Sequence, residues 1–352
     1  MVLQSLAVPI IQAPMLGAQG EAMTLAVSKA GGMGSLAAAS LSPAALAAAV
    51  AKLRSETDKP FGINLFILPP TQADTDAVRA AMARLAPWRE RYGLPAQNIP
   101  NQWAEPFEPQ FAALVEAAPP AASFTFGILT PEQVSALKAR GTWVIGTATT
   151  VAEAKAWQAV GADAICAQGL EAGGHRGTFL KDIAASQIGT LSLLTTIREA
   201  VSLPVIAAGG ITDGKAIAAA LAMGAAAVQV GTAYLLADEA TTSAPWREAI
   251  RQADDDATRL TRAFSGRYAR GIENEFMRAM QPVADEIPAY PIQNALTQEM
   301  RAAAAKAGDA QALSLWAGQS VALAQPGPAA EITKRLWSEA QDALRMASSR
   351  WL

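Results

Sequence analysis

The feature that most constrains this chain is an alternation of short apolar runs with helical patterns. Eight runs are strand candidates: residues 10–12, 34–37, 61–66, 123–127, 142–146, 164–168, 204–208 and 227–230. They are apolar almost throughout, which is typical of strands buried on both faces. Helical patterns follow most of them, at 21–29, 43–54, 131–139, 151–160, 190–200 and 214–223. Four of these patterns follow a residue suited to an N-cap, namely Ser42, Thr130, Thr150 and Asp213.

Eight strand–helix units predict the α/β class and a closed (β/α)8 barrel, the TIM barrel. A doubly wound open sheet is the alternative, but no Gly-x-Gly-x-x-Gly opens the chain. Residues 68–120 interrupt the repeat and predict an insertion with helices near 75–85 and 109–117. The tail predicts helices near 245–253, 297–307 and 329–347. We therefore expect a barrel domain over 1–240 and a C-terminal helical covering region over 241–352 that packs on the barrel mouth.

Composition excludes several classes of function. The chain has 352 residues, with 28 Lys plus Arg against 31 Asp plus Glu, a net charge of −3. No basic excess would drive binding to nucleic acid. A single cysteine, Cys166, and a single histidine, His175, exclude an internal disulfide and multi-His or Cys-based metal sites. Any redox chemistry must therefore come from an organic cofactor.

Two uncharged runs, 30–51 and 216–237, have the length of a membrane span. Glycines and polar residues interrupt both runs, so a strand plus a helix explains each of them better. The N-terminus shows no basic region followed by a cleavage site. We expect a cytoplasmic protein with no membrane partner.

Glycine-rich turns follow the last two predicted barrel strands. Gly209 and Gly210 follow one, and Gly231 and Thr232 follow the other. Loops at these two places commonly hold phosphate in such barrels, because glycine lets backbone N–H groups approach closely. Thr232 would add a hydroxyl donor. The alternative is that the glycines only make tight turns.

Three neutral amides lie on or at the ends of predicted strands: Gln12, Asn64 and Gln168. Such a residue commonly just satisfies neighbouring backbone groups. Three amides converging at one barrel mouth would instead suit a planar heterocycle with carbonyls and ring nitrogens, such as a flavin.

His175 lies among glycines in the loop after the predicted sixth strand, on the same face as the phosphate turns. A histidine can accept a proton near neutral pH. We interpret His175 as a catalytic base; the alternative is a histidine that only holds its loop together by hydrogen bonds.

These segments resemble the nitronate monooxygenase family, formerly called 2-nitropropane dioxygenase. The stretches that carry the resemblance are 12–15, 63–66, 171–177, 207–211 and 229–232, with looser similarity at 264–267, 290–294 and 314–319. The resemblance implies an FMN-dependent flavoprotein, an oxidoreductase that converts alkyl nitronates and O2 into a carbonyl compound and nitrite.

The resemblance also implies roles for residues. His175 would be the base for substrates that enter as neutral nitroalkanes. Tyr290 would line the pocket, while Asn294 and Gln298 stand where relatives carry Tyr or Lys. The expected FMN contacts are Ala13, Pro14, Met15, Asn64, Gln168, Gly173, Gly174, Gly209, Gly210, Gln229, Val230, Gly231 and Thr232.

Other functions stay open on the same fold. An FMN-dependent enoyl-acyl-carrier-protein reductase or an NADH:quinone reductase would share the barrel and the histidine loop, and a non-enzymatic barrel could merely bind phosphate. We expect small-molecule partners, a nitronate or nitroalkane and O2, with a homodimer as an open option.

Overall fold

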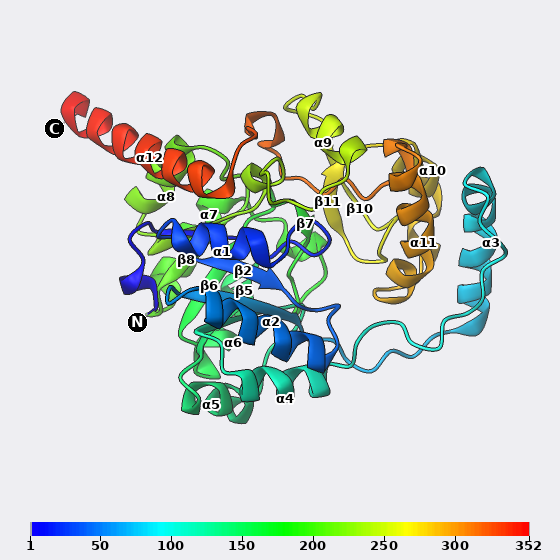
Figure 1. Cartoon of the computed structure of the whole chain (residues 1–352), viewed down its shortest axis with the longest axis horizontal. Coiled ribbons are helices and arrows are strands. Elements are labelled where there is room, and N and C mark those ends of the chain that lie inside the picture. Colours follow the sequence, from blue (N-terminus) through cyan, green and yellow to red (C-terminus); the bar gives the residue numbers. More distant parts are fainter. Residues whose placement is uncertain (1, 352) are drawn as a thin grey trace.

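The computed structural model describes residues 2–351 and contains a barrel of eight parallel strands (Figure 1). The strand order is β1-β9-β8-β6-β5-β4-β3-β2. The ring closes between β1 and β2, because Ile11 bridges Met33 and the Gln12 N–H donates to the Met33 carbonyl at 2.9 Å. The predicted (β/α)8 fold is thus confirmed. The barrel strands are β1 (Ile10–Gln12), β2 (Gly34–Ala37), β3 (Phe61–Phe66), β4 (Ala121–Thr125), β5 (Trp143–Ala148), β6 (Ala164–Gln168), β8 (Val205–Ala208) and β9 (Ala227–Val230).

Helices surround this sheet, and their predicted N-caps are confirmed. Ser42 accepts a hydrogen bond from the Ala45 N–H, and Asp213 accepts one from the Ala216 N–H at 2.8 Å. Capping satisfies backbone donors that a helix start otherwise leaves without a partner. The helices packed around the barrel are α1 (Glu21–Lys29), α2 (Pro43–Glu56), α4 (Phe107–Ala117), α5 (Pro131–Ala139), α6 (Val151–Ala159), α7 (Thr190–Ala200), α8 (Gly214–Ala222) and α12 (Ala329–Trp351).

The barrel strands are buried on both faces. In β6, Ile165 and Ala167 pack outward against the helices, while Ala164 and Cys166 face the barrel interior. This explains why the strands are apolar throughout rather than alternating. Burial raises the pKa of the Cys166 thiol to about 12, so this cysteine behaves as a small apolar residue.

A second layer covers the barrel mouth. It includes an antiparallel sheet in the order β10-β11-β7, formed by Thr258–Thr261, Ala269–Ile272 and Gly174–His175, which the sequence did not predict. Helices α3 (Thr75–Arg91), α9 (Ala244–Arg251), α10 (Glu275–Met280) and α11 (Ile292–Lys306) complete it. We call these elements the covering layer; they share an apolar core separate from that of the barrel.

The two irregular stretches of the chain each divide between barrel and covering layer. Helix α3 of the insertion packs against α11, whereas α4 packs against α2 of the barrel. Helix α12 of the tail lies against α8 and α1 (Figure 1). Its Thr333 hydroxyl lies 2.8 Å from that of Tyr234. A domain boundary at residue 240 stays a prediction. The packing places α3 with the cover and α12 with the barrel.

Within residues 2–351, no helix combines the length and the apolar character that a membrane span requires. The two uncharged runs fold as β2 with α2 and as α8 with β9, as the sequence predicted.

Candidate active site

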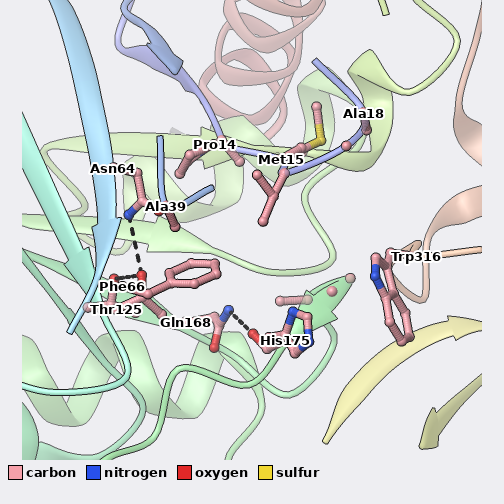
Figure 2. Close-up of a pocket in the computed structure, with 18 of the residues that line it drawn as sticks. Pro14, Met15, Ala18, Ala39, Asn64, Phe66, Thr125, Gln168, His175 and Trp316 are labelled. Atoms are coloured by element: carbon pink, nitrogen blue, oxygen red, sulfur yellow. Dashed lines mark hydrogen bonds between the residues drawn. The ribbon is translucent and has the colours of Figure 1, made fainter. Parts of the chain in front are cut away.

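A cavity of about 630 Å³ lies where the carboxyl ends of the barrel strands meet the covering layer. Figure 2 shows Pro14 and Met15 on one side of it and Gln168 and His175 on the other. Asn294 and Arg301 of α11 line it from the covering layer, and Tyr290 and Trp316 line it from loops next to that layer. The volume is that of a typical small-molecule or cofactor site.

The cavity brings together nearly all of the predicted site residues. His175 lines it, as do Ala13, Pro14, Met15, Asn64, Gln168, Gly173, Gly174, Gly209, Gly210, Gln229, Gly231 and Thr232. Val230 is the exception, because its side chain is fully buried between the strands and the helices. Gln12 was also expected at the mouth. That expectation is wrong, since its buried amide accepts the Ser35 N–H at 3.1 Å and donates to the Ala13 carbonyl.

The two glycine turns offer donors to one end of the cavity. Gly210 has φ +70°, and a Cβ there would lie 3.0 Å from the Glu171 Cβ. No acceptor among residues 2–351 takes the N–H of Gly210 or Gly231. Thr232 Oγ1 accepts the Gly318 N–H at 2.9 Å, so its own proton remains free to donate. Backbone N–H groups and a hydroxyl at such turns suit a phosphate.

The two amides that line the cavity play different parts. Asn64 donates to the Ser123 and Thr125 hydroxyls, at 3.0 and 3.4 Å, which leaves its Oδ1 as an acceptor. Gln168 donates to the His175 carbonyl at 3.0 Å (Figure 2) and accepts the Gly177 N–H at 2.7 Å. Gln168 therefore shapes the histidine loop, a role that the sequence did not predict.

The histidine loop is held from several directions. His175 belongs to β7 and pairs with Ala269 of β11. Arg267 donates from Nε to the Arg176 carbonyl at 3.0 Å. Beyond the histidine, Glu153 is fully buried and accepts the Thr178 hydroxyl at 2.9 Å. These bonds fix the backbone on both sides of the imidazole.

Hydrogen bonding assigns the tautomer of His175. Its Nε2 lies 2.9 Å from Ser265 Oγ, and that hydroxyl donates its one proton to the Arg267 carbonyl at 3.0 Å. Ser265 must therefore accept, so Nε2 carries the hydrogen and Nδ1 keeps the lone pair. Nδ1 has no partner among the described residues and is not among their fully buried polar atoms. The imidazole thus presents a proton acceptor to the cavity.

The surroundings keep His175 neutral. The rings of Phe126, Tyr290 and Trp316 lie 5.5–5.7 Å from the imidazole, centroid to centroid. Burial, with the charges of Arg267 and Arg301, lowers the pKa of His175 to about 3. Desolvation and like charges both disfavour the protonated form. At neutral pH the ring is a base without its proton.

Comparisons with known proteins agree with this geometry. A family model described as "Nitronate monooxygenase" matches residues 2–339. The chain is 43% identical to nitronate monooxygenase of Pseudomonas aeruginosa, over 94% of this chain and 95% of that protein. The chain belongs to the nitronate monooxygenase family. It is an oxidoreductase, as the sequence predicted.

Solved structures support this family assignment. A crystal structure of nitroalkane oxidase from Streptomyces ansochromogenes superposes with a TM-score of 0.91 at 41% identity, covering 98% of this chain and 99% of that one. FabK from Thermotoga maritima is less similar, with a TM-score of 0.76 at 29% identity over 99% and 97% of the two chains. The nitroalkane oxidase is the better guide to the site of this family member.

Sequence reasoning gave no role to Ser265, Arg301 or Trp316, all of which contact or surround His175. Arg301 could have been found, because it stands seven residues after Asn294 and so lies on the same face of a helix. Ser265 offered no local signal, since it reaches His175 through tertiary contacts.

Proposed function

We propose that this protein binds FMN in the cavity and oxidises alkyl nitronates with O2 to a carbonyl compound and nitrite. One observation carries the proposal. A neutral imidazole with an accessible Nδ1, an amide oxygen and two donor-rich glycine turns line one cavity of cofactor size. The family assignment and the match to a nitroalkane oxidase agree with that chemistry.

The residues present fit FMN. Gly210, Gly231 and Thr232 would hold the phosphate through N–H and O–H donors. Asn64 would offer its Oδ1 to a ring N–H, and the Gly173–Gly174 backbone would pass close by. Gly174 has φ +71°, and a Cβ there would meet no atom within 4 Å, so this backbone faces open space. When bound, the flavin would supply the electron transfer to O2 that no side chain here can supply.

His175 would act as the carbon base for neutral nitroalkanes. Nδ1 would remove a proton from the carbon beside the nitro group, while Nε2–H stays bonded to Ser265. The negative charge formed on the substrate would favour the imidazolium and so offset the two arginines. Surrounding aromatic rings would exclude water from this step. A preformed nitronate has already lost this proton and needs no base.

An anaerobic titration tests the function and separates it from its rivals. We expect a nitronate to bleach the yellow protein and, after air is admitted, nitrite to appear. Rapid bleaching by NADH instead would favour the enoyl-acyl-carrier-protein reductase or NADH:quinone reductase reading. A protein that carries no FMN after gentle purification would contradict the cofactor proposal.

The remaining expectations accompany this proposal. We propose a cytoplasmic enzyme that acts on a small nitronate or nitroalkane together with O2. A homodimer is kept as an open option, which sedimentation velocity would decide.

A further inference from the structure

The covering layer places a cation without an acidic partner beside the proposed base. Among the residues that line the cavity, Arg301 and Glu105 carry the charged side chains, since His175 is neutral. Arg301 is half-buried on α11 and forms no ion pair with Glu105 or with any other described carboxylate. Its charge acts on neighbouring groups: it adds to the effect of burial that lowers the pKa of His175, and it opposes the burial that raises the pKa of Tyr290 to about 12.

Other buried arginines of this chain have compensation that Arg301 lacks. Arg89 pairs with Glu299 at 2.8 Å, and the negative charge of Glu153 favours the charged form of both Arg176 and Arg267. Burial lowers the pKa of Arg301 to about 10, and Tyr290 is the one group that opposes the shift. A partly desolvated charge without a counter-charge is costly. The cavity therefore contains a positive charge without a counter-charge, which a bound anion would neutralise.

One N–H donor of Arg301 has no hydrogen-bond acceptor among the described residues. Nε donates to the Thr297 hydroxyl at 3.2 Å and Nη1 to the Ser314 hydroxyl at 3.3 Å. Nη2 donates to both oxygens of Asn294, at 3.0 and 2.9 Å. A guanidinium has five N–H groups, so a second Nη1 hydrogen remains without an acceptor among residues 2–351. All of the acceptors in use are neutral.

We propose that Arg301 recognises the anionic form of the substrate by donating its remaining Nη1 hydrogen to an oxygen of the nitronate group. The inference rests on the proposed function and adds a specificity-determining residue to it. Its neighbours Asn294 and Ser314 hold the guanidinium in place. A neutral nitroalkane gains little from this cation until His175 has removed its proton.

This role predicts a split in kinetics that a merely structural arginine would not give. For a preformed nitronate, Arg301→Gln should raise KM by about 10- to 100-fold, as expected for one charge-assisted hydrogen bond, with kcat little changed. For the neutral nitroalkane the charge forms only in the transition state, so kcat should fall by a similar factor. Arg301→Lys keeps the charge and should recover part of both losses.

The kinetic experiment uses the FMN-loaded enzyme with ethane nitronate and with nitroethane. In a separate binding experiment, calorimetry measures the affinity of the same enzyme for inorganic nitrate, which serves as a planar anion probe. Arg198→Gln is the control, because it removes an equal charge from an exposed site on α7. Weaker nitrate binding in Arg301→Gln together with the kinetic split supports the proposal. An unchanged KM and unchanged nitrate affinity would overturn it, as would a shifted flavin reduction potential with unchanged KM. A wild-type enzyme that leaves ethane nitronate untouched would refute the proposed function instead.

Discussion

The two ends of the cavity are built in different ways. At the glycine turns after β8 and β9, the barrel offers mainly backbone N–H groups. Around the proposed base, His175, Ser265 and Arg301 act through side chains, and all three lie outside the barrel strands. The barrel backbone thus suits an invariant group such as a phosphate. On the proposed function, the covering layer would supply the charge of Arg301 and the proton acceptor of His175 that decide which substrate form reacts.

Removing the base should have the largest effect, and this effect should be confined to the neutral form of the substrate. A general base contributes about 10²- to 10⁴-fold to a rate. We expect His175→Asn to lower kcat/KM for nitroethane by that factor. For ethane nitronate the variant should retain most of the wild-type kcat/KM. Both values are measured as O2 uptake. Equal losses on both forms would show that His175 does not take the carbon proton.

A change at the backbone end should affect cofactor retention rather than substrate preference. Gly210→Ala puts a Cβ on a residue with φ +70° and 3.0 Å from Glu171, so we expect FMN affinity to fall about tenfold. Gly308→Ala is the matched control, because Gly308 has φ +73° and meets no atom within 4 Å. If both variants lost FMN equally in fluorescence titrations, backbone strain alone would account for the loss.

The tautomer of His175 can be observed directly, because the chain has one histidine. We expect nitrogen NMR of the labelled protein to show hydrogen on Nε2. Ser265→Ala should weaken that preference and lower the rate on nitroalkanes about 2- to 10-fold, the value of one neutral hydrogen bond.

The control for this change is Ser28→Ala. Ser28 is buried like Ser265, donates to the Pro60 carbonyl and accepts the Gly34 N–H, and does not line the cavity. Hydrogen on Nδ1 in the wild-type protein would contradict the assignment.

The last test concerns the stability of the fold in acid rather than activity. The folded pKa of His175 lies near 3, below the ordinary value of 6.5 that the unfolded chain should show. The contribution of His175 to the free energy of unfolding is therefore complete above pH 6.5 and is lost as the pH falls from 6.5 toward 3. In urea titrations, wild type should lose more stability over this window than His175→Asn. Parallel losses in the two proteins would mean that the ring takes up its proton as readily in the folded protein as in the unfolded chain.

The barrel could be predicted from sequence because its signals are local. Apolar runs such as 10–12 and 61–66, with caps such as Ser42 and Asp213, coincide with the observed elements. The predicted helix at 75–85 instead continues through Pro87 to Arg91. There the buried Arg89 bonds to Pro95 and Glu299, and this tertiary contact outweighs the local cost of the proline.

The covering sheet was missed for the opposite reason. Strand β7 is two residues long, and its partner β11 lies far away in the sequence, so no local periodicity marks either of them. Gln12 shows a related limit, because an amide on a barrel strand can lie on the side that faces the helices, as Ile10 and Val230 do, instead of at the mouth. The position of His175 at the cavity could be predicted from its loop, whereas its partners Ser265 and Arg301 required the tertiary structure.

A crystal structure of the protein with FMN tests most directly whether the two ends act together. The account predicts the phosphate within hydrogen-bond distance of Gly210, Gly231 and Thr232, with His175 Nδ1 facing the ring system across the space that the substrate would take. A phosphate bound away from these turns, or a ring system that leaves Nδ1 on its far side, would contradict it.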